Sequence, residues 1–435
     1  MSQPNRDPGL TDPSIAASAA DPELIAGAAA EHQVQPTARG FPVLLTALVS
    51  FSALSVDLIL PALPNLIGYF KSDVPTAQLT VSVFIVGFAV AQLAYGSLSD
   101  RFGRRPTLLI GLAVYLIASL ACTLADSMEQ LIVGRFFQAL GACSGIVVGR
   151  AIVRDVYGPK RAAKVLAYVG MVMGLVPAAA PILGGYLTVW FSWRATFIAL
   201  AVFSLAVLLG VKFVLRETNL HRDPTALQPR RMAENFWLLL RSRPYMGYLL
   251  TMCLSYCAMF SFISMSSFVL NDHFHIATED FGPYFSSLVI GYITGSMLAG
   301  RFTARVGTTR MILIGTILEV VAGGVLFGFV LANTQNIYAV LLPVMLLFCG
   351  VGLVVPNALS SAIGPYPRMA GAASALLGFI QAMMGATLSM VVARLHDGTP
   401  MAMAVAVFAS ACLAFVCFYA LIWRREGHFV AQAPY

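Results

Sequence analysis

Long apolar runs make up most of this chain, and the charged residues gather in the short segments between them. The hydrocarbon core of a bilayer is about 30 Å thick, so a helix needs roughly 20 apolar residues to cross it. With 58% hydrophobic and 11% charged residues, the chain has little material for a water-soluble domain. The sequence therefore predicts an all-α integral membrane protein. Twelve segments are candidate spans: 42–62, 76–98, 106–125, 130–152, 162–189, 193–215, 245–270, 281–303, 309–331, 336–359, 368–394 and 400–423.

The basic residues predict how these spans are oriented, because loops rich in Lys and Arg stay on the cytoplasmic side. If both termini are cytoplasmic, all but four of the 27 Lys and Arg lie inside. Lys71, Arg194 and Arg394 then lie outside, and Arg135 lies within a span. This asymmetry supports twelve helices in this order. The net charge of +7 therefore indicates membrane topology, and we expect no nucleic-acid partner.

A polar stretch at 216–243 divides the spans into two groups of six. We expect an N-terminal six-helix bundle at 42–215, a cytoplasmic linker at 216–243 and a C-terminal bundle at 244–425. Residues 1–41 predict a disordered cytoplasmic tail, and 426–435 a second tail. The halves repeat each other, since a shift of 204 residues superposes Gly87, Gly96, Arg101, Gly103, Leu109, Ile110 and Gly111 on Gly291, Gly300, Arg305, Gly307, Leu313, Ile314 and Gly315. Two such bundles joined by a cytoplasmic linker are typical of facilitator transporters.

The turn between the second and third spans is the most specific motif. It reads Gly96-Ser-Leu-Ser-Asp100-Arg101-Phe-Gly103-Arg104-Arg105-Pro106. The glycines allow close backbone approach, and Pro106 suits the first turn of a helix. A basic turn can also be only a marker of topology. The order of residues resembles the loop after the second helix of major facilitator superfamily transporters, Gly-x-x-x-Asp-Arg-x-Gly-Arg-Arg/Lys.

Two charges are expected inside the membrane in the first half. Asp57 lies near the end of the first span, where a lone carboxylate costs about 2.5–3.5 kcal/mol and needs a partner or a water-filled cavity. Arg135 and Gln138 lie on the fourth span. At 1.5 Å per residue, Asp57 and Arg135 are at the same depth, about 8 Å from the outer surface, which predicts that they pair and couple protons. The alternative is that Arg135 extends to the outer interface.

The fifth span carries small residues and two prolines: Gly170, Gly174, Pro177, Pro181, Gly184 and Gly185. Prolines bend a helix, and small residues let a neighbour approach. The segment resembles the antiporter motif of facilitator drug exporters, Gly-Pro-x-x-Gly-Gly, with Ala180 in place of its first glycine. A packing helix of no special function is the other interpretation.

In the second half, the candidate substrate-binding residues are aromatic or amide side chains within spans: Tyr256, Phe260, Phe262, Asn357 and Gln381. The aromatic residues are equally consistent with packing. One acid, Glu319, lies in the ninth span, which is outside the central cavity in the facilitator fold, so Asp57 is the stronger candidate for coupling. We predict Asp57 and Gln138 as the binding residues of the first half.

Four motifs in order resemble the bicyclomycin and chloramphenicol resistance (Bcr/CflA) family of drug:proton antiporters in the major facilitator superfamily. The resemblance implies two pseudo-symmetric six-helix bundles and a proton-driven exporter of mostly apolar drugs in the bacterial inner membrane, working by alternating access. It also implies a conformational latch in which Asp100 faces the start of helix eleven, near Arg368 to Ser374, and Arg104 bridges to Asp155. The motifs are Asp57-x-x-Leu60-Pro61-Ala-Leu-Pro64, Arg154-Asp155-x-Tyr157, Ala180-Pro181-x-x-Gly184-Gly185 and Met369-Ala370-Gly371-x-Ala373-Ser374.

Other functions are less consistent with the sequence. A nucleotide-driven pump would need a Gly-x-x-x-x-Gly-Lys-Ser/Thr loop, which the chain lacks. A membrane enzyme would need a catalytic cluster of His, Cys and acid within the spans. We expect no metal, no cofactor and a monomer. A facilitator-type importer of a sugar or organic acid is the nearest alternative.

Overall fold

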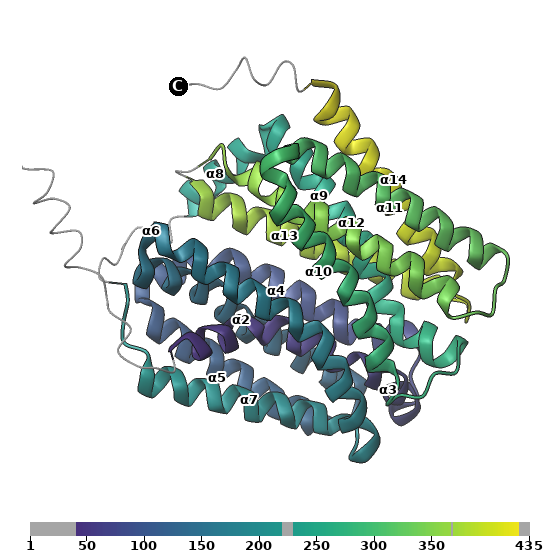
Figure 1. Ribbon diagram of the computed structural model, residues 1–435. Coiled ribbons are helices and arrows are strands. Elements are labelled where there is room, and N and C mark those ends of the chain that lie inside the picture. The colour runs from purple at the N-terminus through teal and green to yellow at the C-terminus, as the bar shows by residue number, and fades with distance from the viewer. Residues whose placement is uncertain (1–40, 220–228, 367–368, 426–435) are drawn as a thin grey trace, which may run out of the picture.

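The computed structural model describes residues 41–219, 229–366 and 369–425, and all regular elements in these ranges are helices. Figure 1 shows two bundles side by side, the first coloured purple to teal and the second green to yellow. The first contains α2 (Phe41–Asp57), η2 (Leu60–Ala62), α3 (Leu63–Phe70), α4 (Val74–Phe102), α5 (Arg104–Thr123), α6 (Met128–Trp190) and α7 (Trp193–Val214). After α8 (Pro229–Arg241), the second contains α9 (Arg243–Ser267), η3 (Phe268–His273), α10 (Phe281–Val306), α11 (Thr308–Leu331), α12 (Tyr338–Ile363), α13 (Ala370–Arg394), α14 (Met401–Leu421) and η5 (Trp423–Arg425).

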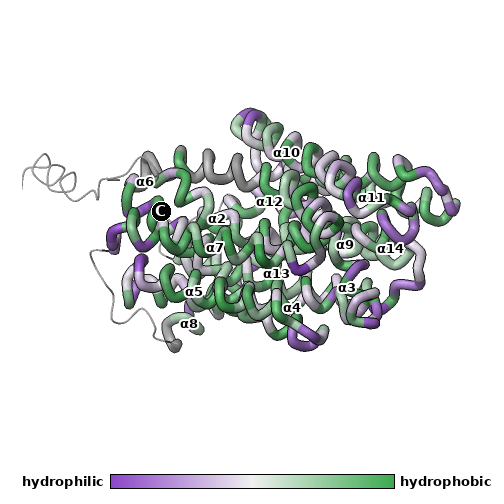
Figure 2. The backbone as a smooth tube through the Cα atoms, turned by 90° about the horizontal axis from the view of Figure 1, so that it is seen from below, coloured by the Kyte–Doolittle hydropathy of each residue, from purple (hydrophilic) through white to green (hydrophobic). Residues whose placement is uncertain are grey.

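The predicted membrane fold is confirmed. Among the described residues, 10 segments are long and apolar enough to cross a membrane. The 26-residue α10 and the apolar segment Gly174–Trp190 of α6 account for the two other predicted spans. Figure 2 shows hydrophobic colouring along the helices, with hydrophilic colouring gathered at chain turns. The predicted tails lie outside the described residues, apart from Phe41, so they stay predictions.

Three local features differ from the sequence expectation. The first span stops at Asp57 and continues as a 3-10 turn and a short helix, because Pro61 and Pro64 lack the amide hydrogens that an α-helix needs. The linker, of which the sequence predicted only the polar character, contains the helix α8. The fourth and fifth spans belong to one helical element, α6, which has no assigned break at 153–161.

Glycine contacts show that α6 nevertheless turns back on itself. A Cβ atom on Gly145 would lie 2.2 Å from the carbonyl oxygen of Leu48, and one on Gly184 would lie 2.1 Å from that of Leu58. Gly145 therefore touches α2, and Gly184 touches the residue directly after its end, only ten residues further along the chain. A straight helix would place Gly145 and Gly184 almost 60 Å apart, at about 1.5 Å per residue. Two spans are therefore retained within α6.

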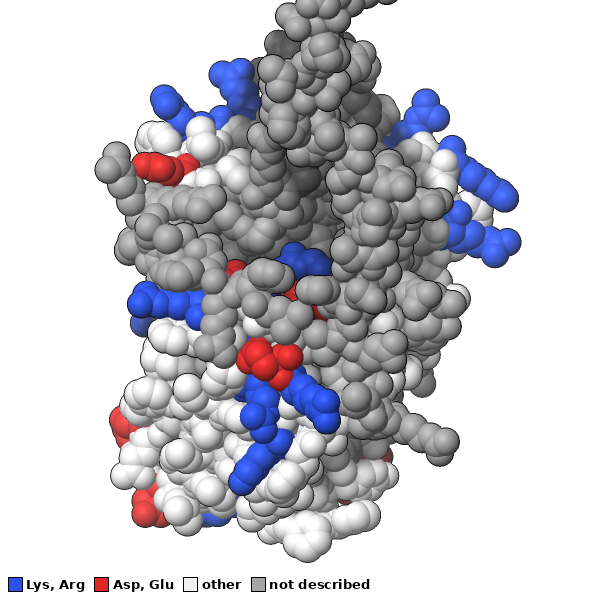
Figure 3. All heavy atoms as spheres, turned by 90° about the vertical axis from the view of Figure 1, so that its left-hand side faces the viewer, with Lys and Arg blue, Asp and Glu red and all other residues white. Residues whose placement is uncertain are grey.

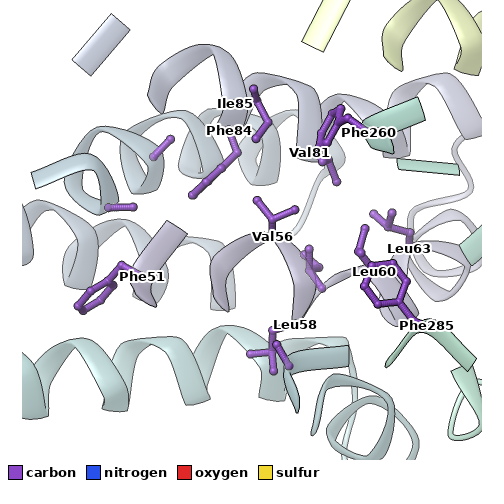
Figure 4. Packing of buried hydrophobic residues seen from close by; sticks show 14 of the residues in the cluster. Phe51, Val56, Leu58, Leu60, Leu63, Val81, Phe84, Ile85, Phe260 and Phe285 are labelled. Atoms are coloured by element: carbon purple, nitrogen blue, oxygen red, sulfur yellow. The ribbon is translucent and has the colours of Figure 1, made fainter. Parts of the chain in front are cut away.

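One apolar core cluster includes residues of both halves, and a second lies within α8 and the second half. Figure 4 shows part of the first cluster, with Val81 and Leu60 from the first half and Phe260 and Phe285 from the second. Two helix pairs make the main seams between the bundles: α4 packs on α13, and α6 packs on α10. A functional site between the halves must therefore lie between these two seams, which are made by α4, α6, α10 and α13.

Candidate functional site

The halves are joined at the end of the molecule opposite to the basic turn 101–105. The chain brings Leu60, Gln78 and Ala178 to this end from the first half. Three hydrogen bonds cross the seam there: Ser267 Oγ donates to the carbonyl of Leu60, Ser286 Oγ to the carbonyl of Ala178, and Gln78 Nε2 to Ser389 Oγ at 2.8 Å. These bonds close that end of the interface.

The small residues of the predicted antiporter motif lie at this closed end. A Cβ on Gly185 would lie 2.7 Å from the carbonyl oxygen of Thr278, and Gly184 meets Leu58. Gly174 faces Ile293 of α10 more loosely, at 3.7 Å. Pro181 is buried and Pro177 half-buried. The motif therefore allows close approach to both α2 and the second half. Gly170 lies in a part of α6 whose side-chain environment is outside the described residues.

Asp57 lies at the end of α2 with its side chain almost fully buried, at 6% exposure. Its carboxyl group makes no hydrogen bond or ion pair with any described residue. It lies within electrostatic range of the Tyr256 hydroxyl on α9, across the seam between the halves. The structure therefore brings together one candidate from each half.

Aromatic and amide groups lie beside this pair. The ring of Tyr256 stacks on Phe260, with centroids 5.5 Å apart and planes 13° apart. On α13, Gly385 meets the Tyr256 ring, and Gly378 meets Gln92 of α4. Gln381 lies between these glycines on the same helix face and is half-buried. We call Asp57, Tyr256, Phe260 and Gln381 the central group.

The expected pairing of Asp57 with Arg135 is absent. Arg135 is fully buried within the first bundle, where its Nε donates to the Thr80 carbonyl at 3.1 Å and its Nη1 donates to Gln138 Oε1 at 2.6 Å. Its guanidinium also lies over the ring of Phe84, 4.3 Å from the centroid. Equal depth did not bring the two charges together, because depth does not determine which helix face a side chain occupies. The alternative, extension of Arg135 to the outer interface, is also wrong.

Three other candidate binding residues are occupied in packing or in hydrogen bonds. Gln138 donates to Ser119 Oγ at 2.8 Å in addition to its bond with Arg135. Asn357 accepts from Thr303 Oγ1 and donates to the Leu353 carbonyl, both at 2.8 Å. Phe262 is fully buried against Phe348. In this structure they lie apart from the central group.

The turn at 96–106 forms a compact ionic cluster. Arg104 Nη1 donates to Asp100 Oδ1 at 2.6 Å and to Ser99 Oγ at 2.6 Å, while its Nε donates to Asp155 Oδ2 at 2.9 Å. The contact between Arg104 and Asp155 implied by the family resemblance is therefore present. No hydrogen bond or ion pair joins Asp100 to the described residues 369–374, and Arg368 lies outside the described residues.

Glu217 and Asn219 complete this cluster and were missed in the sequence, where Glu217 counted only as part of a polar linker. The Glu217 carboxylate accepts from the backbone amides of Arg104 and Arg105, at 2.8 and 3.2 Å. Asn219 donates to the Asp100 carbonyl at 3.0 Å. An acid just after the sixth span could have signalled this cap, because the start of a helix attracts carboxylates.

The other turn residues differ in their exposure. Arg101 is exposed, and Arg105 donates to the Lys212 carbonyl at 2.8 Å. Gly103 has φ +104°, which favours glycine, whereas Gly96 has open space where a side chain would begin. Figure 3 looks onto this end and shows blue basic side chains on several parts of the face, with acidic side chains among them.

Comparisons with known proteins agree with this fold. A model of the Major Facilitator Superfamily matches residues 45–390. A bicyclomycin resistance protein homolog of Haemophilus influenzae is 27% identical over 370 residues, which cover 85% of this chain and 93% of that protein. The multidrug resistance protein MdtL of Escherichia coli is 28% identical over 335 residues, covering 77% of this chain and 83% of MdtL.

Solved structures support the fold alone, because their sequence identities are low. A bacterial homologue of the human lysosomal transporter Spinster, in an inward-facing and unoccupied conformation, has a TM-score of 0.68 at 16% identity, covering 88% of this chain and 97% of that chain. A D-xylose–proton symporter has a TM-score of 0.69 at 13% identity, covering 88% of this chain and 98% of that chain.

Proposed function

Since this chain belongs to the Major Facilitator Superfamily, a family of membrane transporters and not of enzymes, we propose that it is a proton-driven drug antiporter of the bacterial inner membrane. Its substrates would be small, mostly apolar drugs, and both termini would be cytoplasmic. The observation that carries the proposal is Asp57, a buried carboxyl without a hydrogen-bonding or ionic partner among the described residues, within electrostatic range of Tyr256 across the seam. The names of the bacterial relatives support drugs as the substrate class.

The central group favours an apolar substrate. Tyr256 and Phe260 present stacked rings, while Gln381 is the amide side chain beside them. Stacked aromatic surface binds flat apolar molecules without requiring a fixed pattern of hydrogen bonds. The amides of Gln138 and Asn357 already form hydrogen bonds within the protein, so they have little capacity to bind a polar substrate.

Asp57 would couple this binding to protons. A charged carboxylate without a cation is unfavourable in an apolar site, and proton binding removes the charge. A drug that enters next to Asp57 would compete with the proton for the same small space, or it would change the surroundings of the Asp57 carboxyl. One group that responds to both ligands prevents proton and drug from moving together in one state, which is what an antiporter needs.

The closed end supports alternating access. The bonds that join Leu60 to Ser267 and Gln78 to Ser389 would open to release a drug outside. In the proposed cycle, Asp100 leaves Arg104 and meets the start of α13 when the opposite, cytoplasmic end closes. We infer that a monomer performs this cycle, because the seam lies within one chain.

Transport in proteoliposomes tests the proposal. The purified protein is placed in vesicles with an imposed pH gradient and a trapped pH dye, and an apolar drug is added on the side of the basic turn. Proton movement opposite to the drug is the expected result. Movement of a sugar or organic acid in the same direction as protons would instead establish the importer. The fold likeness to the xylose symporter does not favour it, since fold alone does not choose a substrate.

A further inference from the structure

Glu319 of α11 is a second carboxyl inside the protein. Its side chain is fully buried, its Oε2 accepts a 2.8 Å hydrogen bond from Ser255 Oγ of α9, and its Oε1 is buried with no hydrogen-bond partner. Gly350 of α12 faces it, since a Cβ there would lie 2.7 Å from Glu319 Cγ. The absence of a side chain at Gly350 makes room for this carboxyl group.

The surroundings of Glu319 hold no compensating charge. Among the described residues, Arg243 of α9 and Arg301 and Arg305 of α10 form no ion pair with it, and α12 and α14 contain no charged residue. The packed helices otherwise carry thiols and phenols, and none of the following six hydrogen-bonds to it: Cys253, Cys257, Cys349, Cys412, Cys417 and Tyr256. A carboxylate is costly in such a place, whereas a neutral carboxylic acid is not.

The first half has a phenol at the equivalent position. The repeat that superposes Gly111 on Gly315 places Tyr115 at Glu319. Helix packing supports this equivalence. A Cβ on Gly141 would lie 2.6 Å from Tyr115, just as a Cβ on Gly350 would lie 2.7 Å from Glu319. The Tyr115 hydroxyl shares a 2.6 Å hydrogen bond with Ser55 Oγ of α2. A phenol stays neutral at physiological pH, but a carboxyl can gain and lose a proton.

Helix α9 connects Glu319 with the central group. Ser255 bonds to Glu319 inside the second bundle, and the next residue, Tyr256, lies within electrostatic range of Asp57. A small rotation or shift of α9 would change the surroundings of both carboxyls together. The two acids are thus linked by one rigid element rather than by direct contact.

We propose that Glu319 is a second, exchangeable proton-binding site that α9 couples to Asp57. An electron pair on Oε1 takes a proton from the aqueous phase and forms an O–H bond. On release, the electron pair returns to Oε1 and the proton returns to water. The role of this site in export rests on the proposed antiport, but the existence of the site does not.

Infrared spectroscopy of the full chain in lipid nanodiscs tests the site without transport. A protonated buried carboxyl has its own C=O stretching band. We expect a band that is present in the wild type, Asp57→Asn and Tyr115→Phe, absent in Glu319→Gln, and lost from the wild type as the pH rises. The proposal is wrong if Glu319→Gln keeps every carboxyl band of the wild type. It is also wrong if the band that Glu319→Gln lacks does not respond to pH in the wild type.

Proton release on drug binding tests the coupling. In a weakly buffered solution, Glu319→Gln should release about half as many protons per drug molecule as the wild type, because one of two carboxyls is gone. Tyr115→Phe, the matched control, should release as many as the wild type. If Glu319→Gln releases as many protons per drug molecule as the wild type, the proposed coupling of Glu319 to Asp57 is wrong. If the wild type releases none, the proposed antiport fails, and the infrared result still decides the site.

Discussion

The basic turns of the two halves share a backbone but differ in chemistry. Gly103 has φ +104° and ψ 159°, and Gly307 has φ +92° and ψ 150°. The first turn carries Asp100, which pairs with Arg104, whereas the second has Ala304 at that position. Next to Gly103 lies Glu217, while no atom lies within 4 Å of a Cβ on Gly307. The repeat conserves the backbone, and the ionic cluster belongs to the first half.

The interiors of the halves differ in the same way. Gly141 and Gly350 make equivalent close contacts, so helix packing is repeated. The side chains that they face are Tyr115 in one half and Glu319 in the other. Packing therefore follows the pseudo-symmetry, and polar groups depart from it. The following predictions test this distinction.

The largest expected effect is on coupling through the first half. Asp57→Asn removes the proton that Asp57 exchanges for a drug, so the drug should concentrate less steeply. Each proton lost from the exchange lowers the concentration ratio about tenfold for each pH unit of gradient. Drug accumulation in everted vesicles measures it. If Asp57→Asn concentrates drug normally and Glu319→Gln does not, coupling belongs to the second half.

Packing should respond equally in both halves. Gly141→Ala and Gly350→Ala each place a methyl group about 2.6–2.7 Å from a neighbour, and overpacking of this kind costs about 1–3 kcal/mol. Thermal unfolding in detergent measures the loss of stability. Gly174→Ala, where the nearest atom is at 3.7 Å, serves as the control with little effect. A large loss in only one half would show that the packing is not equivalent.

A smaller effect is expected at the Tyr115 hydroxyl. Tyr115→Phe removes its bond to Ser55 and should cost about 0.5–1.5 kcal/mol in stability. Transport and its pH profile should be unchanged, because no exchangeable proton is lost. A shifted pH profile would show that this phenol also takes part in proton transfer.

The smallest effect is expected at the turns. Asp100 is about half exposed, so loss of its charge is worth about 0.5–1 kcal/mol, and Asp100→Asn should slow transport about two- to fivefold. Arg305→Ala in the second turn should have less effect, since Arg305 forms no ion pair among the described residues. The two variants are compared by their initial rates of drug transport at equal expression. Equal rates for Asp100→Asn and wild type would remove the functional difference between the turns.

The helical fold and its repeat could be predicted from the sequence, because hydropathy and glycine patterns act locally along the chain. Apart from the fifth span, which has no separate start within α6, each span from α4 to α14 begins within a few residues of its predicted position. The prediction of a separate fifth span failed where local signals were weak, because α6 continues through residues 153–161 without a break. Asp57 was recognisable in the sequence because a lone acid in an apolar span is conspicuous.

The sequence by itself determined which residues are buried in the membrane and which turns carry charge. Only the tertiary structure decided their partners: Arg135 with Gln138, Asp57 near Tyr256, and Glu217 with the turn at Arg104. Depth follows from position along a span, at a fixed rise per residue. A partner depends on helix rotation and on which helices are neighbours, and these follow from the packing of all side chains together.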